Sequence, residues 1–461
     1  MKVAQLAAAP TVRDTGAMTV LPSVLRRRGT DEYVPPRPTR IEAQAAAMAE
    51  SVVEERARRE RVDPRLAAAG RTGTAIALRA LNDAAGHGFF AVPPEAEHDE
   101  TAAGRCFGDP GGPPVIDVQT HLVNPGRFVG HAADALGWFL GFADGGRWGS
   151  GVDPQLLSPA TWASLVFGQS ETATALITLP PGADDARVID NDEVALCRAL
   201  VDSIAGEGRV LTHAIVHPDR PDELEAMARW SAECAPSGWK AYPLFGADGG
   251  WRLDDAIGDA FLSRVEEVGP RLVAVHKGIS GPVPDAAPAG AAPHDVGPAA
   301  AAHPAVTFLV YHSGYEPLWP EGPHRTGGDG VDALIDSLAG AGIGPDGNVF
   351  AELGSTWQLI LRKPEEAAHL LGKLLLAVGP ERILWGTDSV WYGSPQPLID
   401  AFRAFRIPRW MQDEFGYPDL SDEIRRRILS TNAATVYGVA PAERDDSWVE
   451  FAAERLARAF P

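Results

Sequence analysis

The sequence contains few cysteines. Three occur among 461 residues, at Cys106, Cys197 and Cys234. They are too few and too widely spaced for a disulfide framework or for a paired-cysteine metal site. This scarcity suits a reducing compartment, so the expected location is cytoplasmic. The three side chains are expected to serve as small buried apolar groups.

Long apolar runs and an excess of basic residues are also missing. No uninterrupted apolar stretch reaches the roughly 18 residues that a membrane-spanning helix needs. Arg13 and Asp14 interrupt the region where a secretory signal would need an apolar core. The sequence contains 41 Lys and Arg residues and 62 Asp and Glu residues, so its formal net charge is -21. This charge repels polyanions such as nucleic acids. A small molecule is therefore the expected class of partner.

What the chain does contain is typical of a folded globular protein. Apolar residues make up 45% and charged residues 22% of the sequence. An α/β barrel commonly needs about 250 residues, so a chain of 461 residues can hold one barrel and an extension.

The expected extension covers residues 1–110. Within it, residues 39–63 have the pattern of a long charged helix, and residues 72–90 that of a second helix. The extension is interpreted as an appendage that packs against the barrel or a second subunit, and residues 93–114 as a Pro- and Gly-rich linker to the main domain at 111–461. Residues 58–84 vaguely resemble a twin-arginine leader, but Arg79 and Asp83 interrupt the apolar part, so export is not expected.

Residues 111–461 show eight short β-branched runs that alternate with helical patterns, which predicts a (β/α)8 barrel of the TIM type, in the α/β class. Residues 191–205, 222–235, 254–268 and 364–378 have the i, i+3, i+4 apolar spacing of amphipathic helices. The eight predicted strands lie within 113–123, 172–180, 209–218, 238–246, 271–280, 306–315, 348–356 and 382–391.

Polar residues end several of these runs. His276 and His312 each follow an apolar run, and Asp388 comes just after a Gly-Thr bend. In IDVQTHLV, Gln119 and His121 lie on one face because strand side chains alternate with a period of two. Since a parallel barrel brings the carboxyl ends of its strands together, these side chains are expected to surround one divalent cation. Imidazole and carboxylate suit zinc first, with manganese or iron as alternatives.

The chain resembles the amidohydrolase superfamily, in the branch that includes aminocarboxymuconate semialdehyde decarboxylase and related aromatic acid decarboxylases. The resemblance covers about residues 114–440 and rests on IDVQTHLVNP, HKG, YHSGYE, AELGST, WGTDS and STNAATVYG. It implies His121, His276 and Asp388 as metal ligands and His312 as the catalytic histidine. The family carries His, or in some relatives Glu, where this chain has Gln119. A neutral amide oxygen at that position is a weaker ligand.

Other residues near these strand ends have expected roles. Lys240 is expected to contact a substrate carboxylate, with a metal-bridging role as the alternative. Glu352 is expected to accept a hydrogen bond from a ligand histidine, with a purely structural strand end as the alternative. The aromatic side chains expected to contact a flat substrate are Tyr242, Trp391 and Tyr392.

Three functions remain open from the sequence. The first is a metal-dependent hydrolase that acts on an amide, lactone or ester bond of a small cyclic or aromatic substrate, with Asp388 and His312 moving protons. The second is non-oxidative decarboxylation of an aromatic or enoic acid. The third is a binding protein that has lost its metal, for which Gln119 is the main argument. A homodimer is the default expectation for assembly.

Overall fold

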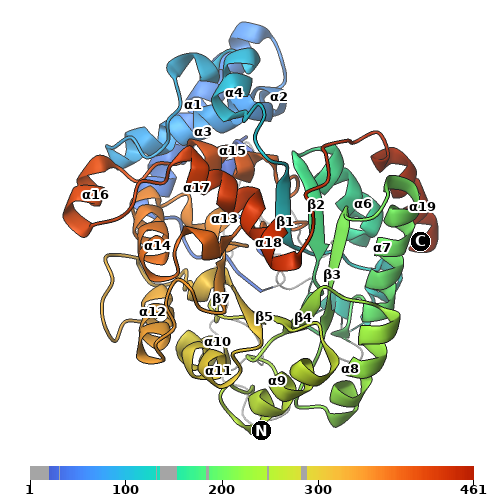
Figure 1. Ribbon diagram of the computed structural model, residues 1–461. Coiled ribbons are helices and arrows are strands. Elements are labelled where there is room, and N and C mark those ends of the chain that lie inside the picture. The colour runs from blue at the N-terminus through green and yellow to red at the C-terminus, as the bar shows by residue number, and fades with distance from the viewer. Residues whose placement is uncertain are drawn as a thin grey trace, which may run out of the picture.

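The computed structural model describes residues 20–30, 32–130, 132–134, 136, 153–182, 186–246, 249–281 and 288–461. Eight parallel strands follow one another around a nearly closed barrel, which confirms the expected (β/α)8 fold (Figure 1). Each predicted run contains one of the strands, which are β1 Val115–Thr120, β2 Thr172–Ile177, β3 Val210–Ile215, β4 Gly238–Ala241, β5 Leu272–His276, β6 Thr307–Tyr311, β7 Val349–Glu352 and β8 Ile383–Leu384.

The barrel closes between its first and last strands. Thr120 at the end of β1 bridges Ser389 beyond β8, and the Val118 amide donates to the Trp385 carbonyl. Nearly every strand residue is buried, because helices cover the outside and side chains fill the inside. This double burial explains why the strands have continuous apolar sequences rather than alternating ones.

Helices surround the strands, and the four amphipathic patterns are all helical. The helix α7 begins at a capping box, in which Asp190 and Glu193 each accept the other's backbone N–H. The helices that follow β1 along the chain are α6 Pro159–Ala163, α7 Asn191–Ala205, α8 Pro221–Glu233, α9 Ala256–Val268, α10 Pro288–Ala291, α11 Val296–Ala302, α12 Val331–Gly340, α13 Thr356–Ile360, α14 Pro364–Ala377, α15 Gln396–Ala404, α16 Arg409–Phe415, α17 Asp422–Arg426, α18 Asn432–Tyr437 and α19 Val449–Ala459.

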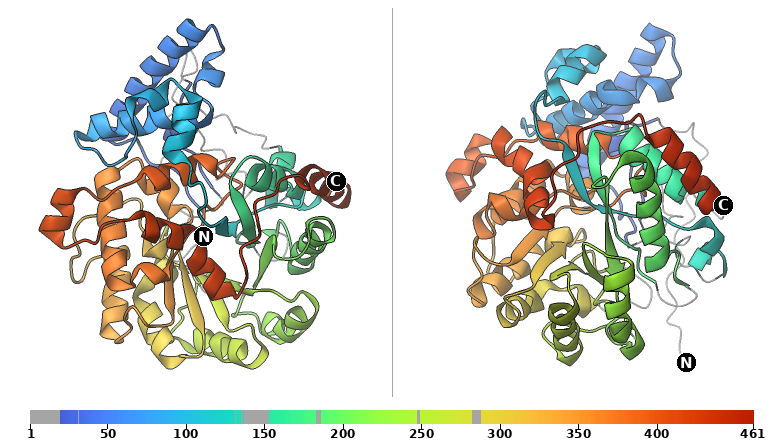
Figure 2. Two further views of the ribbon diagram at one scale, coloured as in Figure 1. Left: turned by 45° about the horizontal axis from the view of Figure 1, so that its top comes forward. Right: turned by 45° about the vertical axis from the view of Figure 1, so that its right-hand side comes forward.

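The N-terminal extension forms a helical layer on one end of the molecule (Figures 1 and 2). It contains α1 Arg40–Glu60, α2 Pro64–Ala67, α3 Gly70–Ala85 and α4 Glu100–Phe107. The expected linker is therefore partly helical. Asp99 caps α4 by accepting from the Thr101 amide, and Phe107 is buried, so this segment has both a start signal and an apolar face.

The extension packs against the barrel, as one of the two expected arrangements required. One hydrophobic cluster includes Ala49 of α1 and Leu78 of α3 together with Trp357 and Phe402 of the barrel domain. Phe90, which follows α3, forms an isolated bridge with Phe405, and their rings lie 5.3 Å apart. The face of α1 that takes part in this packing is built mainly from alanines.

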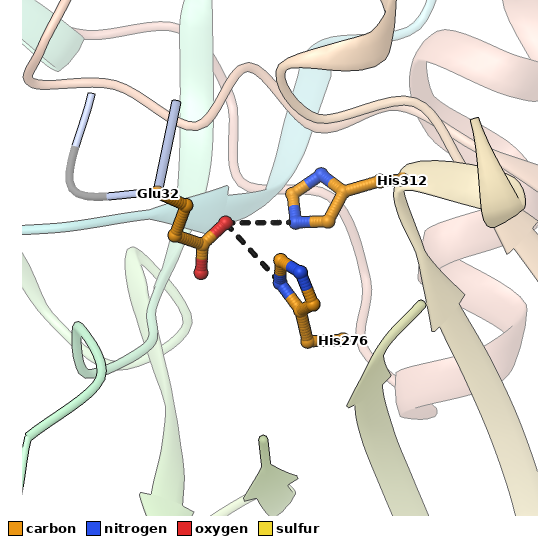
Figure 3. A group of neighbouring side chains, drawn as sticks. All are labelled: Glu32, His276 and His312. Carbon is orange, nitrogen blue, oxygen red and sulfur yellow. Dashed lines mark ion pairs between the residues drawn. The ribbon is translucent and has the colours of Figure 1, made fainter. Parts of the chain in front are cut away.

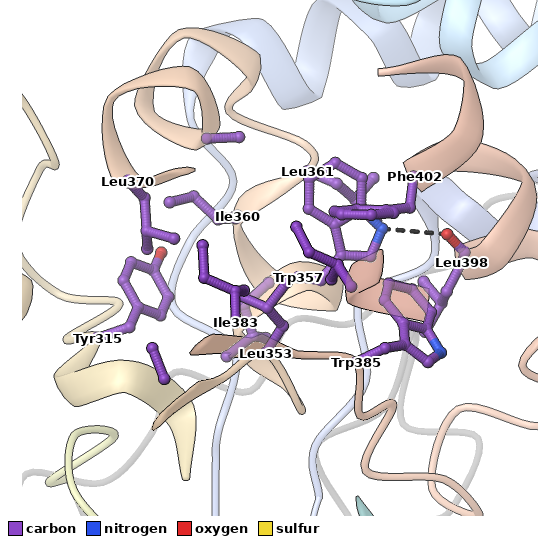
Figure 4. Close-up of a cluster of buried hydrophobic side chains, with 14 of the residues drawn as sticks. Tyr315, Leu353, Trp357, Ile360, Leu361, Leu370, Ile383, Trp385, Leu398 and Phe402 are labelled. Atoms are coloured by element: carbon purple, nitrogen blue, oxygen red, sulfur yellow. Dashed lines mark hydrogen bonds between the residues drawn. The ribbon is translucent and has the colours of Figure 1, made fainter. Parts of the chain in front are cut away.

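Close packing also fixes the part of the barrel wall that carries β7 and β8. Figure 4 shows Trp357, Trp385 and Phe402 packed close together, and the Trp357 indole N–H donates to the Leu398 carbonyl at 3.1 Å. The Trp357 and Phe402 rings meet edge to face at 5.2 Å. The loops that leave β7 and β8 therefore start from a rigid base.

The membrane and leader expectations have different outcomes. Among the described residues, no helix is both long and apolar enough to cross a membrane. Arg13 and Asp14, which argued against a secretory signal, lie outside the described residues. The twin-arginine-like stretch runs from the end of α1 through α3, and most of α3 is buried.

Candidate active site

Two histidines lie side by side at the carboxyl ends of β5 and β6. His276 is the last residue of β5 and pairs with Tyr311, so His312 comes one residue further on the neighbouring strand. The two rings lie 4.7 Å apart. His312 Nδ1 donates to the Gly354 carbonyl at 2.7 Å, which leaves Nε2 facing the site. His312 and Ser313 have φ values of 68° and 54°, a strained left-handed conformation that often marks functional positions.

A glutamate from the N-terminal segment joins these histidines. Glu32 is only 3% exposed, and its Oε2 lies 3.2 Å from His276 Nδ1 and 3.1 Å from His312 Nε2 (Figure 3). Glu32 was not among the predicted residues, since nothing in the local pattern DEYVPP places a carboxylate near a strand some 240 positions away. We refer to Glu32, His276 and His312 as the β5–β6 side of the site.

A second group comes from β1 and the segment after β8. Asp388 Oδ1 lies 2.8 Å from His121 Nε2 and accepts a hydrogen bond from Gln119 Nε2 at 3.2 Å. The Ser355 hydroxyl, which the sequence analysis also missed, donates to Asp388 Oδ2. Asp388 has φ 61° and Ser355 φ 50°, so this group is strained as well. We refer to Gln119, His121 and Asp388 as the β8 side.

Polar atoms on both sides are buried without a hydrogen-bond partner. They belong to Glu32, Gln119, His121, His276 and His312. Buried polar atoms are normally paired, and an unpaired cluster of carboxylate and imidazole atoms is the donor set that a divalent cation fits. Within the described part of the chain, one set of at least three His, Cys, Asp or Glu side chains has ligand atoms all within 4.8 Å of one another, namely Glu32, His276 and His312.

Burial and mutual contact shift the pKa values on the β5–β6 side in different directions. Burial acts to raise the pKa of Glu32, but the charge of His276 and contacts with both imidazoles hold it well below its ordinary value. Burial lowers the pKa of His276 more than Glu32 raises it. For His312 burial also acts downward, but the contact with Glu32 and its charge outweigh burial and raise the pKa.

Two further buried carboxylates accept hydrogen bonds from residues next to the site. Glu352 at the end of β7 accepts the backbone N–H of His312 at 3.2 Å and of Gly354 at 2.6 Å, and burial raises its pKa to about 8. Its partner is thus the backbone of His312 rather than the ring. A Cβ at Gly386 would collide with this carboxylate. Asp117 accepts from Thr387, and burial raises its pKa to about 7.

The other predicted residues lie around the same region. Lys240 Nζ lies 3.9 Å from the centre of the Tyr311 ring and 4.4 Å from that of Tyr242. The Tyr242 ring lies 5.6 Å from that of His276. The Trp391 ring lies 5.8 Å from that of His121, and the Tyr392 hydroxyl is 2.5 Å from that of Ser355.

Comparison with known proteins defines the class. The amidohydrolase family model matches residues 116–439, so the chain belongs to the amidohydrolase family, which is a family of enzymes. A search of curated proteins found no match.

Solved structures that match part of the chain include decarboxylases and a probable hydrolase. The 2,6-dihydroxybenzoate decarboxylase from Rhizobium is 15% identical over 71% of this chain and 99% of its own, with a TM-score of 0.43. The 5-carboxyvanillate decarboxylase from Sphingomonas paucimobilis is 12% identical over 71% of this chain and 99% of its own, with a TM-score of 0.45. A probable 2-pyrone-4,6-dicarboxylic acid hydrolase from Acinetobacter baumannii is 12% identical over 70% of this chain and 99% of its own, with a TM-score of 0.43.

Proposed function

We propose that the protein is a metal-dependent hydrolase that cleaves an amide, lactone or ester bond in a small cyclic or aromatic substrate. Family membership supports the reaction class. The observation that carries the proposal is the cluster of buried, unpartnered imidazole and carboxylate atoms at the ends of the barrel strands. Active sites of such barrels are built at this end.

The proposed ligands are Gln119, His121, His276 and Asp388. Nitrogen and oxygen donors of this kind suit zinc, with manganese and iron as the alternatives. Such a cation, when bound, supplies an activated water and polarises a substrate oxygen.

The chain's own residues would then move the protons. Asp388 is the proposed proton acceptor, and its Oδ2 is oriented by the Ser355 hydroxyl. His312 is the proposed donor to the leaving group, because its Nδ1 is engaged with Gly354 and its Nε2 faces the site. Tyr242, Trp391 and Tyr392 are proposed to contact the substrate.

Non-oxidative decarboxylation is the second candidate. Lys240, fully buried against two tyrosine rings, can attract a substrate carboxylate. In this reaction His312 would protonate the ring carbon that carries the carboxylate, and cleavage of the C–C bond would release carbon dioxide. The third interpretation, a binding protein without a metal, predicts no bound ion at all.

Elemental analysis of the purified chain tests the proposal. One zinc, manganese or iron ion per chain is expected, and a His121→Ala, His276→Ala double variant should lose it. A panel of lactones and anilides, assayed in parallel with carbon dioxide release from aromatic acids, separates the two reactions. A wild-type chain that takes up none of the three metals would disprove both. A cytoplasmic location and a homodimer stay predictions.

A further inference from the structure

The position of Glu32 is specified by the surrounding chain. The Glu32 amide donates to the Thr30 hydroxyl at 3.0 Å, and the Thr30 amide donates to the Tyr33 carbonyl at 3.0 Å. Leu25 before this turn and Tyr33 after it are both buried in the main hydrophobic cluster. The segment is therefore anchored on both sides of Glu32, and the carboxylate is held inside the protein rather than placed there by a loose end.

A carboxylate at this depth needs positive charge nearby. Removing an ionised carboxyl from water costs several kcal/mol unless a cation compensates it. The ion-pair contacts of Glu32 are with His276 and His312, and an imidazole carries a charge only when it is protonated. A divalent cation would supply the charge without protonating either ring.

The spacing between Glu32 and His276 fits two ligands that share an ion. The contacts of 3.1 and 3.2 Å lack hydrogen-bond geometry, since the atoms involved have no hydrogen-bond partner. Two ligands on one tetrahedral zinc ion, each bonded at about 2.0–2.1 Å, lie about 3.3 Å apart. The observed separations are close to this value.

The β8 side explains why an additional carboxylate is useful. Gln119 is neutral, and its Nε2 donates to Asp388 Oδ1, so this position adds no negative charge to the site. We infer that Glu32 is a ligand of the divalent cation, reaching it from the β5–β6 side and supplying the charge that Gln119 lacks. The inference rests on the proposed function, because that function requires the cation. The N-terminal segment then becomes part of the active site.

Metal binding by Glu32→Gln in the full-length chain tests this inference without an assay of activity. Affinities for Zn²⁺ are measured by competition with a chelator, and the visible spectrum of the Co²⁺ form reports on the ligands. Loss of an outer partner of a metal ligand typically lowers affinity 10–100-fold, so loss of a direct ligand should lower it by at least about 100-fold. The Co²⁺ spectrum should change as well.

Glu42→Gln is the matched control. Glu42 is also a buried carboxylate of the extension, but it pairs with Arg362 at 3.2 Å, away from the histidines. Its variant should bind Zn²⁺ as the wild type does. Unchanged affinity and an unchanged Co²⁺ spectrum in Glu32→Gln, with metal lost in His276→Ala, would overturn the inference and leave the proposed function standing. Tighter Zn²⁺ binding by Glu32→Gln would overturn the inference too, because it would show that the Glu32 side chain blocks the metal site instead of binding the ion. No binding by the wild type would disprove both.

Discussion

The two sides of the site hold their carboxylates in different ways. On the β8 side, both oxygens of Asp388 accept hydrogen bonds from neutral donors, Gln119 and Ser355, which belong to the barrel itself. On the β5–β6 side, Glu32 comes from the N-terminal segment and meets two imidazoles without hydrogen-bond geometry. The first arrangement is stabilised by the fold, whereas the second depends on added positive charge.

The largest effect should come from breaking the β8 side at Asp388. Asn at this position keeps the size of the side chain and can still accept from Ser355, but it cannot take up a proton at the site. We expect Asp388→Asn to lower kcat by about 10²–10⁴-fold, the usual contribution of a general base, on whichever substrate of the panel is turned over. Thermal unfolding should show a folded variant. A folded Asp388→Asn chain with nearly wild-type kcat would remove Asp388 from the mechanism.

Gln119→Glu should make the stability of the β8 side depend more strongly on the bound cation. The variant loses the amide donor to Asp388 and brings two buried carboxylates together. Without metal we expect a loss of about 3 kcal/mol in the free energy of unfolding, as for other uncompensated buried charges. Saturating Zn²⁺ should restore most of it.

The measurement is chemical denaturation of metal-free and Zn²⁺-loaded protein, with the wild type in parallel. The Zn²⁺-dependent stabilisation should be larger in Gln119→Glu than in the wild type. An equal response of the two proteins to Zn²⁺ would show that position 119 does not face the cation.

The sequence predicted the barrel and the strand-end residues on both sides of the site, but not Glu32. Strand-end positions found His121, His276, His312 and Asp388, because a parallel barrel gathers the carboxyl ends of its strands. Glu32 could not be found in this way. It lies in no strand, and its place depends on the packing of the extension against the barrel, which no local periodicity encodes.

Ser355 was missed for a related reason. It stands in AELGST, just past β7, and its role depends on a left-handed backbone that points the hydroxyl at Asp388. Charged residues dominate the pattern of α1, so the sequence predicted that the extension packs against the barrel or a second subunit but not which residues make the contacts. Contacts between elements distant in the chain were therefore the part that the sequence left open.

Ser355→Ala tests how the β8 side holds Asp388, with a smaller expected effect on stability. It removes the donor to Asp388 Oδ2 and leaves that buried oxygen unsatisfied. We expect a loss of about 1–3 kcal/mol in the free energy of unfolding. Tyr392→Phe is the control, since it removes the hydroxyl beside Ser355 but leaves the bond to Asp388, and its effect should be smaller. If the two variants proved equally unstable, the bond from Ser355 would not be what holds Asp388.

The smallest effect is expected at a carboxylate outside both sides. Glu223 on α8 accepts from His217 and Arg187, and although burial acts to raise its pKa, these partners lower it to about 2. A depressed carboxyl pKa stabilises the fold above the ordinary value of 4.5, and this contribution is lost as the pH falls from 4.5 toward 2. Glu223→Gln should therefore cost about 1 kcal/mol near pH 6, because the charge is lost but the Gln side chain keeps one oxygen that can accept from the same donors. Denaturation curves at decreasing pH should show that the difference in the free energy of unfolding between the wild type and the variant becomes smaller. A difference that stays constant or grows in acid would refute the stabilising role of the ionised Glu223.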